Sequence, residues 1–168
     1  MRILVHLAIG FLAVGSQVAI APLLSVYGCK PNLVLVSLLA ITLRWPNPWL
    51  FLYGAGTGLA LDALSHGSLG VYGISFLVIA IASRMAAALI YENNLLSGAL
   101  VVGGLSVAEG ALSAALFELL DPATPWWRWL LLRVLPTAIY NALFAPLFLL
   151  ALARLERVLK WTREGWGI

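Results

Sequence analysis

Four ionisable side chains lie within apolar stretches of the sequence: Asp62, Arg84, Glu109 and Arg133. A charged group in a lipid bilayer is costly, so such a residue by default marks a functional site or an internal ion pair. Glu109 is placed the most deeply of the four, and it needs a cationic partner or a proton. We predict an ion pair between Glu109 and Arg133 that holds two neighbouring helices together. Arg84 is the alternative partner, unless its long side chain reaches the membrane surface.

Asp62 stands near the end of an apolar stretch, just before a segment rich in serine and glycine that includes His66, Gly67 and Gly70. A carboxylate in this setting can accept hydrogen bonds from the backbone of a tight turn. We favour that turn-anchoring role over the alternative, in which Asp62 and the turn form a contact surface for another protein. A turn anchor is needed for folding, whereas a contact residue is needed only for partner binding.

The sequence lacks the motifs of the common enzyme classes. It contains no Walker motif, no Gly-x-Ser-x-Gly nucleophile motif and no His-Glu-x-x-His zinc motif. The histidines, His6 and His66, are far apart, and the single cysteine, Cys29, excludes an intramolecular disulfide and a multi-cysteine metal site. We therefore predict no catalytic activity, no cofactor and no bound metal.

The composition defines the environment of these residues. Of the 168 residues, 62% are hydrophobic and only 10% are charged, whereas a soluble domain has roughly 25% charged residues. The mean hydropathy of +1.00 excludes a disordered chain, a disulfide-stabilised secreted module and a soluble enzyme. The charges form no cluster suited to nucleic acid. The chain is thus predicted to be an all-α membrane protein that binds no nucleic acid.

Six apolar segments, separated by proline, glycine, asparagine and charged residues, predict one six-helix transmembrane domain over residues 1–153. Their approximate ranges are 3–26, 32–43, 49–64, 69–91, 95–120 and 129–153. The second segment is short and is opened by Pro31, a residue suited to the first turn of a helix. About 12 residues at ~1.5 Å each cover only about 18 Å of a roughly 30 Å hydrocarbon core. Five spans with a re-entrant second segment are therefore the alternative.

Basic residues predict the orientation of the helices. With both termini in the cytoplasm, seven Lys and Arg residues lie on the inner side and three on the outer side, in agreement with the positive-inside rule. The inner residues are Arg2, Arg44, Arg84, Arg154, Arg157, Lys160 and Arg163, and the outer ones are Lys30, Arg128 and Arg133. The N-in, C-in arrangement fits an even number of spans.

Residues 154–168 are predicted to form a short, basic, amphipathic tail in the cytoplasm. Leu155, Val158 and Leu159 share one helical face, and the basic residues lie mostly elsewhere. Such a helix lies on the membrane surface and is attracted to anionic lipid. A solvated continuation of the last span and a docking surface for a cytoplasmic partner are the alternatives.

Small residues at helical spacing let membrane helices approach closely. Gly54 and Gly58 form such a pair in the third segment. In the fifth segment, the small residues on one face are Ala99, Gly103, Ser106, Gly110 and Ala114. We favour packing within the bundle for both faces; the alternative is that one of them receives the transmembrane helix of another protein.

The sixth segment contains Pro136, Asn141 and Pro146. A proline inside a membrane helix bends it and leaves a carbonyl group that neighbouring groups must satisfy. The two prolines therefore predict a bent helix, either as a simple packing feature or as the wall of a concave surface or cavity.

Taken in order, these features resemble the MreD family of bacterial rod shape-determining membrane proteins. The resemblance covers nearly the whole chain in size and in the number and order of segments. Its most specific part is a Gly-x3-Asp-x4-Gly-x2-Gly stretch, and family members more often have an acidic residue at the position of Asn32. The residues that carry it are Pro31, Asn32, Arg44, Gly58 to Asp62, Ser65 to Gly70, Pro136, Asn141 and Pro146.

The resemblance implies a non-catalytic scaffold in the inner membrane, within the machinery that builds the lateral cell wall and maintains rod shape. Its expected direct partner is MreC, a protein with one membrane span and an extracytoplasmic domain. MreB, RodA and a class B penicillin-binding transpeptidase are more distant partners. In this scaffold a Gly- and Ala-lined groove receives the MreC helix, Asp62 and the turn after it form the outer contact, and Arg44 and the basic tail lie inside.

The family is also similar in fold to the substrate-binding component of energy-coupling-factor transporters. The alternative function is therefore binding of a vitamin-type solute, coupled to an ATPase module. That function requires several polar and aromatic side chains to converge from different helices, as in most ligand sites.

Overall fold

The computed structural model describes residues 2–26, 28–45, 49–65, 70–86, 94–120 and 126–159. Within these ranges all regular structure is helical, apart from one isolated β-bridge between Val26 and Cys29. The predicted all-α class is confirmed. The elements are α1 (Arg2–Ala19), η1 (Ala21–Leu24), α2 (Leu33–Arg44), α3 (Leu50–Leu64), α4 (Val71–Ala86), α5 (Leu95–Leu120), α6 (Trp126–Trp129), η3 (Leu130–Val134) and α7 (Leu135–Leu159).

These helices follow the six predicted apolar segments, with three differences at the ends. α1 ends at Ala19 and is followed by the short 3-10 helix η1, so the first segment is not one helix to residue 26. α4 is described to Ala86, and the rest of its predicted range lies outside the described residues. α7 runs without a break across the boundary predicted between residues 153 and 154 to Leu159. The last helix therefore continues into the predicted tail, whose residues 160–168 are not described.

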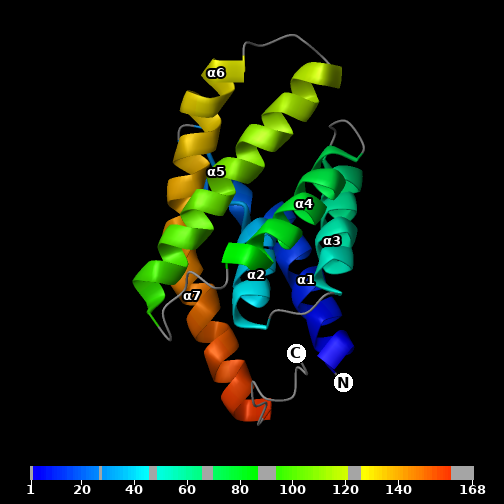
Figure 1. Ribbon diagram of the computed structural model, residues 1–168, viewed down its shortest axis with the longest axis vertical. Coiled ribbons are helices and arrows are strands. Elements are labelled where there is room, and N and C mark those ends of the chain that lie inside the picture. The colour runs from blue at the N-terminus through cyan, green and yellow to red at the C-terminus, as the bar shows by residue number, and fades with distance from the viewer. Residues whose placement is uncertain are drawn as a thin grey trace.

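Two of the described helices are long and apolar enough to cross a membrane: Leu95–Leu119 in α5, and Trp127–Leu159, in which α6, η3 and α7 form one rod. Four further apolar helices have 10–17 residues. The start of α1 and the end of α7 lie at one end of the molecule, and α6 lies at the other (Figure 1).

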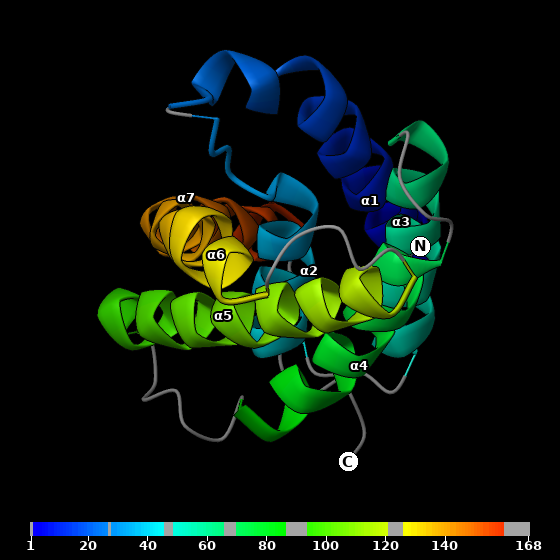
Figure 2. The same ribbon diagram turned by 90° about the horizontal axis from the view of Figure 1, so that it is seen from above.

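The short helix α2 lies at the centre of the bundle and packs against α1, α3, α4, α5 and α7 (Figure 2). Every residue from Leu33 to Leu43 is buried, as expected for a helix that is apolar on all sides. The hydroxyl groups of its two buried polar residues donate to backbone carbonyls of the same helix. Ser37 donates to the Val34 carbonyl at 2.8 Å, and Thr42 donates to the Leu38 carbonyl at 2.9 Å.

Helices α3 and α4 pack closely because glycine removes the side chains between them. A Cβ atom on Gly54 would lie 2.8 Å from the Phe76 carbonyl oxygen, and one on Gly58 would overlap the Tyr72 carbonyl. The third-segment glycines are therefore used for contact between two helices of the same chain.

The predicted small-residue face of α5 is also used within the chain. A Cβ atom on Gly103 would contact Ala142 of α7 at 3.2 Å, and one on Gly110 would lie 2.5 Å from Val134 of η3. Ser106 and Ala114, on the same face, are buried. This face holds α5 against the rod, as the packing interpretation predicts.

Candidate functional site

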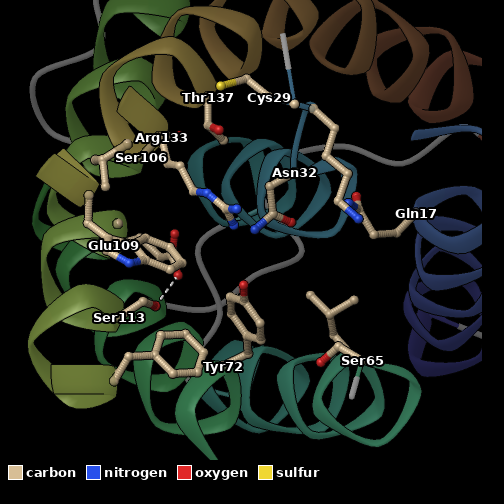
Figure 3. Close-up of a pocket in the computed structure, with 17 residues that line it drawn as sticks. Gln17, Cys29, Asn32, Ser65, Tyr72, Ser106, Glu109, Ser113, Arg133 and Thr137 are labelled. Atoms are coloured by element: carbon tan, nitrogen blue, oxygen red, sulfur yellow. Dashed lines mark hydrogen bonds between the residues drawn. The ribbon is translucent and has the colours of Figure 1, made fainter. Parts of the chain in front are cut away.

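A polar cavity of about 190 Å³ lies beside the irregular segment that precedes α2. Figure 3 shows labelled side chains around it that come from α1, α4, α5 and the rod. The lining residues are Gln17, Gly28, Cys29, Lys30, Asn32, Leu61, Ser65, Tyr72, Ser106, Glu109, Gly110, Ser113, Phe117, Trp129, Arg133, Val134 and Thr137. The predicted site residues Asn32, Glu109 and Arg133 are thus brought together around one cavity.

The rod has a π-helical turn, η3, where it lines the cavity. Pro136 has no amide hydrogen, so the Leu132 carbonyl, four residues earlier, lacks its usual helical donor. The Cys29 thiol donates to this carbonyl oxygen at 3.1 Å, and the Leu135 amide donates to Leu130, five residues earlier. Arg133 and Val134 of this turn line the cavity. Pro146 lies further along, inside α7.

The first turn of α2 is satisfied by side chains from two sources. Asn32 is its N-cap, and the Asn32 carboxamide oxygen accepts a hydrogen bond from the Leu35 amide at 3.1 Å. Gln17 of α1 accepts from the Leu33 amide at 2.6 Å and donates to the Pro31 carbonyl at 3.2 Å. The sequence analysis did not identify Gln17, although a buried glutamine within an apolar helix is itself a signal.

Asn141 of α7 links its helix to the segment before α2 and to α5. Its side-chain oxygen accepts from the Asn32 amide at 2.8 Å, and its side-chain nitrogen donates to the Ser106 hydroxyl of α5 at 3.1 Å. Asn141 is fully buried, so each of these bonds replaces a bond to water. The asparagine between the two prolines is therefore a structural centre of the bundle.

Glu109 is 5% exposed, and its carboxylate accepts a hydrogen bond of 2.6 Å from Ser113, one helical turn away. The Ser113 oxygen also lies 3.0 Å from the Ser75 hydroxyl of α4. These three residues form a polar chain from α5 to α4 at the buried side of the cavity.

The predicted ion pair between Glu109 and Arg133 is not formed. Within the described ranges, the one ion pair closer than 4.0 Å joins Arg44 to Glu156. The Arg133 guanidinium instead lies over the ring of Trp129, 4.8 Å from its centroid. Arg133 is exposed, whereas Glu109 is buried. Both side chains line the cavity, but they do not contact each other.

Asp62 anchors the turn before α4, as we favoured from the sequence. Its carboxylate accepts hydrogen bonds from the amides of Gly70, Tyr72 and Gly73 at 3.0, 3.1 and 2.9 Å. Gly70 has a φ of 98°, which a side chain would strain. Asp62 is 1% exposed, so it is not the outer contact residue of the alternative hypothesis. His66 and Gly67 lie outside the described residues.

Arg44 and Glu156 join the end of α2 to the end of α7. Arg44 pairs with the Glu156 carboxylate, and the indole N–H of the buried Trp45 donates to the same carboxylate. Glu156 was not identified from the sequence, because the partner lies 112 positions away. Together with the contact between Asn32 and Asn141, this pair aligns α2 with the second half of the rod. At the other end of α2, the segment before the helix is held by Asn141 and Gln17.

The described residues contain no group of three or more metal-ligating side chains. His6, the one histidine in the described ranges, packs against Trp45 and Tyr53 with ring centroids 5.7 and 6.5 Å apart. His6 does not line the cavity. What the cavity offers is a buried carboxylate, two cationic groups and several hydroxyl groups, an arrangement suited to binding.

No family model, curated protein or solved structure matches the chain.

Proposed function

We propose that the chain is a non-catalytic scaffold of the bacterial inner membrane, with six spans and both termini in the cytoplasm. Its exposed surface supports the membrane location. Large apolar side chains point outward on α1, α4 and α5, including Phe11 at 81%, Met85 at 79% and Leu119 at 81% exposure. The buried polar residues Asp62 and Asn141 lie inside. This distribution is suited to a lipid environment, because lipid tails solvate apolar side chains but offer no hydrogen-bond partners to polar groups.

One observation carries the scaffold role: α5 has a second small-residue face, which points outward. Gly104, Ala108 and Ala115 are exposed on this face, between Leu100 and Leu119. A Cβ atom on Gly104 would meet nothing within 4 Å, in contrast to Gly103 and Gly110 on the inward face. Small residues on a lipid-facing helix allow the backbone of another helix to approach closely. The outward face of α5 is therefore the docking face that we propose.

The occupant that we propose is the single transmembrane helix of a bitopic partner, which the resemblance to MreD identifies as MreC. A helix docked on α5 fixes where the extracytoplasmic domain of that partner stands above the membrane. MreB, RodA and a class B penicillin-binding transpeptidase would join through MreC. The Arg44 and Glu156 pair lies at the cytoplasmic end in this orientation, where anionic lipid meets the basic tail.

The size of the cavity argues against the transporter alternative. Pockets for drug-sized ligands have volumes of roughly 300–1,000 Å³, whereas this cavity has about 190 Å³. A vitamin-type solute would need a larger space. The cavity is suited to a smaller molecule.

Affinity purification of a tagged chain from its native membrane tests the proposal. We expect mass spectrometry to identify a bitopic MreC-type protein together with cell-wall synthases. Gly104→Leu should lower the recovery of the bitopic protein by about fivefold, since a contact between membrane helices contributes on the order of 1 kcal/mol. Gly15→Leu is the matched control, because Gly15 of α1 is also exposed with nothing within 4 Å of an added Cβ atom.

Two results would contradict the proposal. Recovery of paired ATPases with a coupling subunit would identify the chain as a transporter component. Equal loss of the bitopic protein in Gly104→Leu and Gly15→Leu would show that the outward face of α5 is not the docking face.

A further inference from the structure

We propose that the cavity binds a small zwitterion of the amino-acid class, with its carboxylate at Arg133 and its ammonium group at Glu109. The inference concerns the cavity alone and goes beyond the scaffold role. Its failure would leave the docking of a partner helix on α5 untouched.

The cationic wall of the cavity is suited to a carboxylate. Arg133 and Lys30 both line the cavity and both are exposed. The Arg133 guanidinium rests on the Trp129 ring and has no carboxylate within 4.0 Å among the described residues. Figure 3 shows its side chain extending into the cavity. A guanidinium held by an aromatic ring and lacking an acidic partner has its donors available for a carboxylate, which it binds in a fork geometry.

Glu109 gives the cavity a group suited to an ammonium group. Glu109 is only 5% exposed. Among the described residues, its carboxylate accepts one hydrogen bond, from Ser113. No Lys or Arg side chain lies within 4.0 Å of it among the described residues. Burial of a carboxylate without a cation is costly. A ligand ammonium group would supply that cation, and Ser106 and Tyr72 also line the cavity.

The volume selects a small ligand. A cavity of about 150 Å³ is known to hold a benzene molecule, so the 190 Å³ here has room for about six to nine non-hydrogen atoms. An amino acid with a short side chain falls in this range. Glu109 and Arg133 both line the cavity and form no direct ion pair, so a molecule with both charges would satisfy both groups, whereas a simple anion or cation satisfies only one.

The backbone beside the cavity points to a binding site independently. Residues 28–32 carry no helix, yet Asn141 and Gln17 hold this segment inside the bundle. Non-helical backbone at membrane depth is tolerated where it is buried in protein or lines a cavity. Gly28, Cys29 and Lys30 of this non-helical segment line the cavity.

Equilibrium binding to the purified full chain in detergent tests the inference. The probes are isotope-labelled glycine, L-alanine and L-aspartate, with acetate and methylammonium as competitors that carry one charge each. We expect saturable binding of at least one amino acid at one site per chain. Acetate and methylammonium should compete at least about tenfold more weakly, because each forms only one of two charge-assisted contacts.

Two charge-removing variants locate the site. Glu109→Gln and Arg133→Gln should each weaken binding of the amino acid by about tenfold or more. Glu118→Gln and Arg128→Gln are the matched controls, because neither residue lines the cavity, and they should leave binding within about twofold. If Glu109→Gln unfolds, the exposed Arg133→Gln still tests the site, with thermal unfolding showing that the protein is folded.

Absence of saturable binding of all three amino acids to the folded chain would overturn the inference. Acetate binding as tightly as the amino acid would also overturn it, because the site would then be an anion site. Unchanged binding in Arg133→Gln would place any bound amino acid elsewhere.

Discussion

Three buried side chains in this bundle satisfy backbone groups at breaks in helical structure. Asp62 accepts from three amides at the start of α4, and Asn141 accepts from the Asn32 amide before α2. Cys29 donates to the Leu132 carbonyl that Pro136 cannot satisfy. Each unpaired backbone group would cost about 1–3 kcal/mol when buried. Asp62, Asn141 and Cys29 therefore have structural roles. The charged groups that line the cavity, Glu109, Arg133 and Lys30, have no such role.

Asp62→Asn should destabilise the protein by about 2 kcal/mol or more, seen as a lower midpoint of thermal unfolding in detergent. The amide has one acceptor oxygen in place of two, and its NH₂ group would face backbone donors, so charge-assisted bonds of roughly 1.5–3 kcal/mol each are weakened or lost. Glu118→Gln is the control for the same chemical change on α5. Binding of the bitopic partner per folded molecule should not change. Normal stability with loss of the partner would instead make Asp62 a contact residue.

At the scale of elements, the sequence predicts where helices occur but not which way they face. The apolar runs and the breaks at Pro31 and at the turn after Asp62 set the order of the helices, and the structure agrees. α5 is apolar on all sides, so nothing in its pattern distinguishes the inward Gly103 from the outward Gly104. The rotation of a helix about its axis depends on contacts with distant segments. For the same reason Glu109 was assigned the wrong partner and Glu156 was not identified.

Gly58→Ala should destabilise the contact between α3 and α4 by about 1–3 kcal/mol, because the added methyl group meets backbone atoms of Tyr72 and Gly73 that cannot move aside. Gly56 provides the matched control on the same helix, since a Cβ atom there meets nothing within 4 Å. Gly56→Ala should leave stability equal or raise it by about 0.5–1 kcal/mol, because alanine is the better helix former. Thermal unfolding of both variants in one detergent measures the difference. Equal effects would mean that the two helices are not in close contact.

For the whole molecule, the number of membrane crossings depends on whether the short α2 returns the chain across the membrane. Its start is level with Asn141 and its end is level with Glu156, so it accompanies only the second half of the rod. The segment before it covers the remaining depth, with Cys29 beside Leu132. Lys30 therefore lies near the same end of the rod as Arg128. This arrangement fits the six crossings that we propose, with a non-helical stretch that is partly buried and lines the cavity.

Cysteine labelling with a membrane-impermeant maleimide distinguishes six crossings from five. Cys29→Ser removes the single native thiol and keeps a donor for the Leu132 carbonyl. In that background, Lys30→Cys and Arg128→Cys should both react from outside intact cells, while Arg84→Cys and Arg157→Cys should react only after permeabilisation. All four positions are exposed, so differences in labelling report the side of the membrane. If α2 does not cross the membrane, only the three helices α3, α4 and α5 cross it between positions 30 and 128. Lys30→Cys and Arg128→Cys must then label from opposite sides.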